Sequence, residues 1–192
     1  MLTAVKIEKN KQKFLESSRT YNVFTKELED FLGEEFFLAP ASAYLTMYGC
    51  YPGGLVDHLL KVCKYSIQLN ELLPEKMREN KASIVKCVFI SQIGKTFMFV
   101  QNESEWHRTN QGKMYEYKTD DTISMSIGEK SAYYALKYGV ELSEVEYQAV
   151  IFANRGDSDK SGKWAYTQLA HLLKLGFEMA LLEEKNGQGQ NS

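Results

Sequence analysis

Hydrophobic residues recur along most of this chain at the three- and four-residue spacing of amphipathic helices. Such patterns cover residues 21–32, 55–67, 142–152 and 166–184. The third contains a Ser-Glu-Val-Glu sequence at 143–146, a capping box that marks the start of a helix. Together these patterns predict an all-α fold, a bundle of six or seven helices.

One segment departs from this helical spacing. Residues 101–124 are polar and irregular, but residues 113–117 alternate between polar and apolar and predict a short strand, half of a small β-hairpin. The first 17 residues are polar and lysine-rich, and they predict a loosely docked helix.

The sequence divides into three parts. Residues 1–35 form an N-terminal helical segment, and residues 36–184 form the main helical domain. Residues 185–192 are rich in Gly, Asn and Gln, and they predict a disordered tail.

The most apolar run of the chain extends from Val88 to Val100, and Ser91 and Gln92 interrupt it. A buried polar group without a partner costs about 1–3 kcal/mol, so these two side chains need partners or border a cavity. The run therefore predicts a central helix whose polar notch faces a pocket. It is too short for a bilayer span, which needs about 20 apolar residues.

Composition excludes several classes. With 44% hydrophobic and 25% charged residues, the chain has the profile of a globular protein. A net charge of -2 gives no basic field and disfavours nucleic acid as a partner. Three cysteines without motif spacing, Cys50, Cys63 and Cys87, and an N-terminus unlike a secretory signal predict reduced thiols in a cytoplasmic protein, with no membrane association.

The end of the central run resembles a known motif. Ile93, Gly94 and Lys95 match the Ile-Gly-Lys that follows the central His-Asp pair in the HD-domain superfamily of metal-dependent phosphohydrolases. In this chain Ser91 and Gln92 stand at the His-Asp positions.

Other stretches extend the resemblance over most of residues 36–184, to a branch of the superfamily common in phages, prophages and gut bacteria. Residues 37–42 resemble its entry segment, and residues 128–131 match a Gly-Glu-Lys-Ser element. Residues 51–58 resemble a Gly-Gly-Leu-x-x-His element, which places His58 at the first metal-ligand position. Residues 169–180 resemble the last helix. The resemblance implies an HD-like helical bundle.

The remaining ligand positions depart from the family. Ile127 stands where a histidine precedes Gly-Glu-Lys-Ser, and Ala153 or Asn154 stands at a later histidine. Phe177 replaces the aspartate of the last helix, and the nearby His171 is out of phase with it. Since Ile and Phe cannot coordinate a cation and a hydroxyl or amide does so poorly, His58 alone remains of the set.

We therefore expect an inactive HD-like pseudoenzyme, with no catalytic residue, metal or other cofactor, that binds a phosphorylated ligand of nucleotide type or a protein partner. Lysine and a helix N-terminus can hold a phosphate without cleaving it. The ligand-binding candidates are His58, Ser91, Gln92, Lys95, Lys130 and Asn154. A lone histidine on an apolar helix face is also typical of a hydrogen-bonded core residue, and the lysines also fit ordinary solvated charges.

Two alternatives stay open. The aromatic residues Trp106, Tyr115 and Tyr117 are of the kind enriched at interfaces and favour a protein partner. The resemblance to the phage branch implies that this partner is a host protein. The other alternative is an active metal-dependent nucleotide phosphohydrolase with a rearranged site, in which Asp57, Glu129 or Glu178 supplies the missing ligands and a divalent metal is the cofactor.

Overall fold

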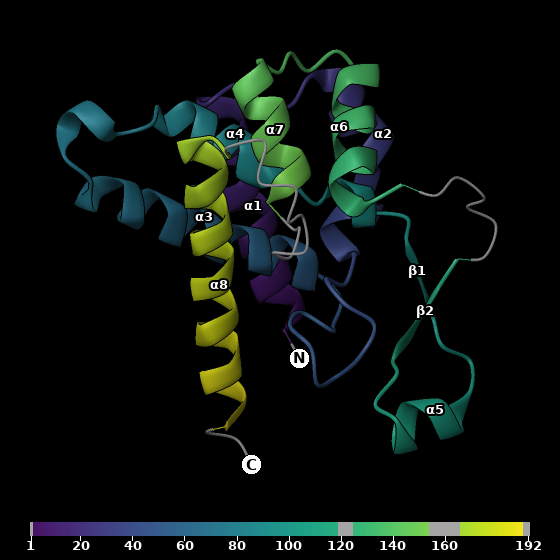
Figure 1. Ribbon diagram of the computed structural model, residues 1–192. Helices are drawn as coiled ribbons and strands as arrows, with labels where there is room; N and C mark the ends of the chain where they lie inside the picture. Colours follow the sequence, from purple (N-terminus) through teal and green to yellow (C-terminus); the bar gives the residue numbers. More distant parts are fainter. Residues whose placement is uncertain (1, 119–124, 154–165, 190–192) are drawn as a thin grey trace.

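The computed structural model describes residues 2–118, 125–153 and 166–189, with side chains up to residue 185. It is mostly helical, as predicted: the described residues form eight α-helices and one two-stranded antiparallel hairpin (Figure 1). Within these ranges, no helix combines the length and apolar character needed to cross a bilayer. The elements are α1 (Ala4–Thr20), α2 (Lys26–Leu38), α3 (Gly54–Leu72), the 3₁₀ turn η1 (Glu75–Met77), α4 (Lys81–Ile90), the 3₁₀ turn η2 (Ile93–Lys95), β1 (Phe99–Gln101), α5 (Glu105–Asn110), β2 (Tyr115–Tyr117), α6 (Ile127–Lys137), α7 (Glu144–Phe152) and α8 (Gln168–Gly189).

Helix α8 crosses in front of α3 (Figure 1), and the two helices approach each other very closely. The Ser66 hydroxyl of α3 donates to the carbonyl of Leu172 in α8 at 3.4 Å. Gly176 lies opposite Ser66, and a Cβ at position 176 would lie only 2.1 Å from the Ser66 Oγ. The absence of a side chain at Gly176 therefore permits the close approach of the two helices.

The N-terminal helix is an integral part of the core. Phe14 of α1 is fully buried, and its ring stacks on that of Phe89 in α4 with centroids 3.9 Å apart. An edge contact with Phe36 in α2 joins the same cluster. The prediction of a loosely docked N-terminal helix is therefore wrong: no charged residue of α1 is buried, and Phe14 anchors the inner side of the helix.

Helix α2 crosses the boundary predicted between residues 35 and 36. Gly33 adopts a positive φ of 55°, which kinks α2, and the helix resumes as far as Leu38. At the other end of the chain, α8 continues to Gly189, so the tail predicted to be disordered from residue 185 begins as helix. Residues 190–192 lie outside the described residues.

The central apolar run is not one helix, contrary to the prediction. Helix α4 ends at Ile90, and Ser91 caps it. The chain then turns through η2, where a Cβ on Gly94 would lie 2.9 Å from the carbonyl oxygen of Ile127. The Gly94 amide donates to Ser131 Oγ in α6 at 2.9 Å. The run breaks because Gly94 packs directly against the first turn of α6.

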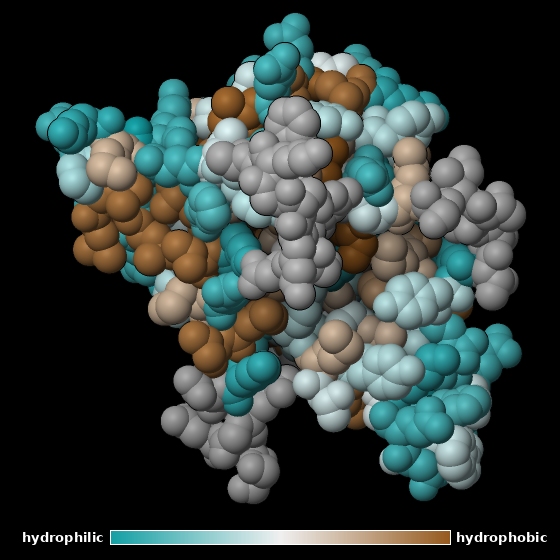
Figure 2. Space-filling view, viewed as in Figure 1, coloured by the Kyte–Doolittle hydropathy of each residue, from teal (hydrophilic) through white to brown (hydrophobic). Residues whose placement is uncertain are grey.

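The predicted strand is present and forms half of a hairpin. Strand β1 pairs with β2, with Val100 opposite Glu116. Between the strands lies α5, and the whole excursion extends away from the helical body (Figure 1). On the face shown in Figure 2 the excursion is hydrophilic, and apolar surface gathers over the C-terminal end of α3 and over α8. Leu72 and Leu182 are among the exposed apolar residues of these two helices.

Candidate ligand-binding site around His58

A buried polar cluster surrounds His58 of α3, one turn into the helix that the Pro-Gly-Gly turn begins. The imidazole is 0% exposed. Its ring lies 4.4 Å from the ring of Tyr48 and 4.8 Å from the ring of Phe177, measured between centroids. The one histidine that matches the family pattern is therefore fully buried, with an aromatic ring from Tyr48 and another from Phe177 beside it.

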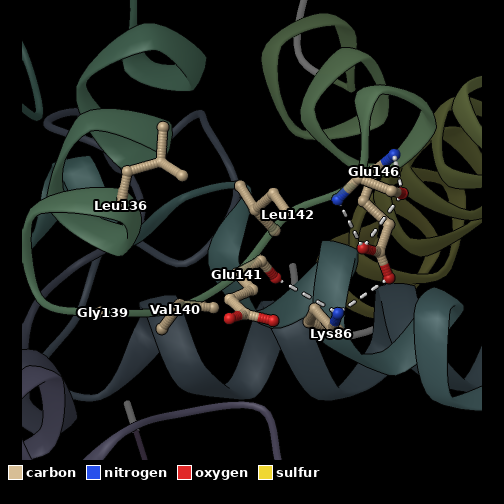
Figure 3. Close-up of a pocket in the computed structure, with 8 residues that line it drawn as sticks. Lys86, Leu136, Gly139, Val140, Glu141, Leu142 and Glu146 are labelled. Atoms are coloured by element: carbon tan, nitrogen blue, oxygen red, sulfur yellow. Dashed lines mark hydrogen bonds and ion pairs between the residues drawn. The ribbon is translucent and has the colours of Figure 1, made fainter.

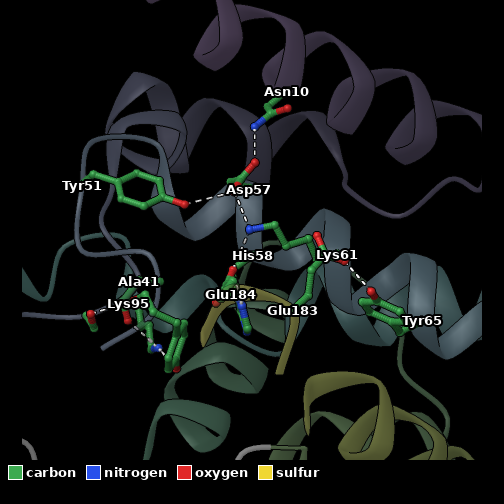
Figure 4. Close-up of polar contacts among 12 residues, drawn as sticks. Asn10, Ala41, Tyr51, Asp57, His58, Lys61, Tyr65, Lys95, Glu183 and Glu184 are labelled. Carbon is green, nitrogen blue, oxygen red and sulfur yellow. Dashed lines mark hydrogen bonds and ion pairs between the residues drawn. The ribbon is translucent and has the colours of Figure 1, made fainter. Parts of the chain in front are cut away.

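The Glu184 carboxylate of α8 contacts both His58 and Lys61 of α3 (Figure 4). Glu184 Oε1 lies 3.3 Å from His58 Nδ1 and 2.9 Å from Lys61 Nζ. Because a carboxylate only accepts, the histidine donates from Nδ1, and its Nε2 is an acceptor while the ring is neutral. Burial lowers the pKa of His58 and so favours that neutral form. Burial by itself would raise the pKa of Glu184, but the contacts with His58 and Lys61 outweigh it and lower the pKa.

Lys61 also contacts a second carboxylate. Its ammonium lies 2.8 Å from Asp57 Oδ2. Asp57 in turn accepts from Asn10 of α1 at 2.8 Å and from the Tyr51 hydroxyl at 3.1 Å. Lys61 thus lies between Asp57 and Glu184, and the network connects α1, α3 and α8 (Figure 4).

Lys95 approaches the cluster from η2. It is 4% exposed, and its ammonium donates to the Ala41 carbonyl at 2.8 Å and to the Tyr48 hydroxyl at 2.9 Å. Both partners are neutral, so burial lowers the pKa of Lys95 to about 7. Tyr48 links the two halves of the site, because its ring lies against His58 while its hydroxyl binds Lys95.

Several buried polar atoms of the site have no hydrogen-bond partner. They are His58 Nε2, Glu184 Oε2 and both terminal atoms of the Gln92 amide, and Gln92 is 0% exposed. Each such atom costs about 1–3 kcal/mol, and buried polar side chains in proteins are nearly always paired. A donor-and-acceptor set of this kind fits a polar guest molecule.

The structure groups some of the predicted residues and not others. His58 and Lys95 share Tyr48 as a neighbour, and Gln92 lies in the turn that leads to Lys95. Ser91 is buried, but its hydroxyl donates to the Val88 carbonyl at 2.8 Å and serves the end of α4. Lys130 lies in the first turn of α6 beside Gly94, and partial burial lowers its pKa. Asn154 lies outside the described residues.

Sequence reasoning missed Lys61, Tyr48 and Glu184. Lys61 follows His58 by three residues and Asp57 by four, so helical spacing alone places it beside both. Glu184 lies 126 residues after His58 in the chain, and no local pattern connects them.

The divalent metal that the family resemblance implies does not fit these residues. The cation between Asp57 and Glu184 is the Lys61 ammonium, and a second lysine, Lys95, lies nearby. Among the residues that the structure describes, no group of three or more His, Cys, Asp or Glu side chains is arranged to hold a metal ion.

A separate groove lies between α4 and the α6–α7 connection (Figure 3). Its volume is about 820 Å³, and Leu136, Val140 and Leu142 form part of its wall. Lys86 pairs with Glu146 at 2.9 Å, and Glu146 completes the capping box of α7. Lys86 and Glu146 therefore bind each other and stabilise the start of α7. None of the predicted site residues lines the groove.

Comparison of the chain with protein-family models, with curated protein sequences and with solved structures finds no match. The likeness to the HD superfamily therefore rests on the motif residues given above.

Proposed function

We propose that this protein is an HD-like pseudoenzyme that binds a phosphorylated small molecule of nucleotide type in the cluster around His58, without hydrolysing it. The observation that carries the proposal is the set of orphaned polar atoms on His58, Gln92 and Glu184. All of these atoms are buried, and His58 and Gln92 stand at positions that the motif resemblance assigns to metal ligands of the family.

Lys95 supports a phosphate in preference to a neutral guest. Its ammonium has only neutral hydrogen-bond partners, Ala41 and Tyr48, and its pKa of about 7 leaves it partly uncharged at neutral pH. An anion bound beside it would raise that pKa by favouring the charged form. Binding would then draw a proton from the buffer.

Calorimetric titration with a panel of nucleotides and cyclic nucleotides tests the proposal. At pH 7.5, in buffers of different ionisation enthalpy, we expect binding with net proton uptake. Lys95→Met should weaken binding and abolish the uptake, while Lys9→Met, at an exposed position, should leave both unchanged. Absence of heat with the whole panel would contradict the proposal.

An assay of phosphate release separates this function from an active hydrolase. With Mn²⁺ or Mg²⁺ and the same nucleotides, we expect no turnover, because Lys61 holds the position between the carboxylates. Turnover that His58→Ala abolishes, together with stoichiometric bound metal, would establish the enzyme instead.

A protein partner is the second candidate, and one observation favours it. Trp106 and Tyr117, on the excursion between η2 and α6, are 59% and 60% exposed. Large aromatic side chains dominate the energetics of interfaces. If a partner binds there, Trp106→Ala with Tyr117→Ala should abolish its capture from a lysate while leaving nucleotide binding intact.

A further inference from the structure

The carboxylate of Glu184 reaches into the cluster from a helix far along the chain. It accepts from His58 and from Lys61, and its side chain is 7% exposed. The neighbouring Glu183 binds Lys64, and also Tyr65, on the outer side of the same two helices. Only one of the two consecutive glutamates therefore enters the site.

The charges in the cluster balance when Lys95 is protonated. Asp57 and Glu184 then carry the negative charges, and Lys61 and Lys95 are the two cationic groups. Burial keeps His58 neutral. An additional anion would give the buried cluster one uncompensated negative charge, which is costly at low dielectric. An anion that replaces the Glu184 carboxylate keeps the balance, because Glu184 can move to solvent.

We propose that His58 and Lys61 form an oxyanion subsite for a phosphate group of the ligand, which Glu184 occupies until the phosphate displaces it. This inference rests on the proposed function, and it adds Lys61 as a ligand contact and Glu184 as an internal competitor. A carboxylate and a phosphate present similar acceptor oxygens, and both form charge-assisted hydrogen bonds with lysine. Since Glu184 lies near the C-terminal end of α8, its exchange needs movement of the last turns of α8 alone.

Titration with inorganic pyrophosphate in metal-free buffer tests the subsite, and the chain offers matched controls. Glu184→Gln removes the competing charge but keeps the shape of the side chain. We expect it to bind pyrophosphate about tenfold more tightly than the wild type, within the usual range of coupling between competing groups. Glu183→Gln should leave the affinity unchanged, because Glu183 binds only Lys64 and Tyr65 among the described residues.

Lys61 distinguishes a direct contact from an indirect one. If Lys61 binds the phosphate, Lys61→Met should weaken binding in the wild type and also in the Glu184→Gln background, whereas Lys64→Met should not. If Lys61 only holds Glu184 in place, Lys61→Met should tighten binding in the wild type and change nothing when Glu184 is already Gln. Circular dichroism checks that each variant folds, and Lys61→Gln, which also removes the charge, replaces Lys61→Met if the latter does not fold.

Each outcome decides. Binding by the wild type with no gain in Glu184→Gln overturns the competitor and leaves the proposed function standing. If Glu184→Gln binds pyrophosphate and the wild type does not, the result strongly supports competition between the Glu184 carboxylate and the phosphate. Absence of pyrophosphate binding in both overturns the subsite, and nucleotide binding measured separately then shows whether the proposed function fails with it.

Discussion

Lys95 is a buried cation whose hydrogen-bond partners are neutral, so its protonation is coupled to folding. Its pKa falls from the ordinary 10.5 to about 7 in the folded protein. Between these values the unfolded chain carries a proton that the folded chain lacks. The free energy of unfolding contributed by Lys95 therefore increases as pH rises from about 7 towards 10, and it is least favourable below pH 7.

Lys95→Met removes this dependence. It also leaves Ala41 and Tyr48 without their donor, at a cost that is the same at every pH. Relative to the wild type, we expect the variant to be most stable near pH 6.5 and to lose that advantage steadily towards pH 9.5. Urea unfolding at several pH values measures the difference. Lys9→Met is the control, and parallel pH profiles for wild type and Lys95→Met would contradict the burial of the charge.

The three cysteines give a second prediction at the residue scale. Burial raises the pKa of Cys50 to about 11, that of Cys63 to about 12, and that of Cys87 still higher. Because the thiolate is the reactive form, all three should react slowly with a disulfide reagent at pH 8 and rapidly in urea. Fast reaction of any thiol in the native protein would show that its surroundings open readily.

At the scale of elements, the contact of α3 with α8 depends on Gly176. Helix propensity alone predicts that Gly176→Ala stabilises the protein by up to ~1 kcal/mol. The new Cβ, however, would lie 2.1 Å from Ser66 Oγ and 3.0 Å from the Ser66 backbone nitrogen. Since overpacking of this kind costs about 1–3 kcal/mol, we expect a net loss of stability.

Urea unfolding measures the change, and Glu178→Ala, on the exposed side of α8, is the control. Stabilisation by Gly176→Ala would mean that the two helices can separate without cost. Nucleotide affinity should fall in the same variant, because α8 carries both Phe177 and Glu184 to the site.

The elements were predictable where a local pattern defines them. The capping box at Ser143 correctly marks the start of α7, and residues 113–117 contain β2. The prediction of one central helix from Val88 to Val100 was wrong, because the apolar character of this run reflects burial and not a continuous helix. What ends α4 is the packing of Gly94 on α6, a contact between segments about 35 residues apart that no window of sequence contains.

The same limit applies to the site at the scale of the whole molecule. His58, Gln92 and Lys95 were found from short motifs, and all three side chains are buried. Glu184 could not be found, because its role depends on how α8 packs against α3. Asn10, which fixes Asp57, belongs to a segment whose composition indicates only a polar helix.

The contact of Asn10 with Asp57 bears on whether α1 is a separate part of the molecule. Phe14 packs on Phe89 and Phe36, and Asn10 reaches the site network, so α1 should unfold together with the rest of the described structure. Phe14→Ala removes a fully buried ring and should cost about 3–5 kcal/mol, in the range measured for such truncations. The matched control is Val5→Ala, in the same helix at a position that is 80% exposed.

Far-ultraviolet circular dichroism and tyrosine absorbance, followed through urea unfolding, check this prediction. In one cooperative unit, Phe14→Ala shifts a single transition that both probes report at the same midpoint. If α1 were an independent segment, the variant would instead lose a fraction of its helical signal at low urea and leave the main transition in place. Loss of nucleotide affinity should accompany the shift only where the protein unfolds, because Phe14 acts on the site through the fold and touches none of its polar groups.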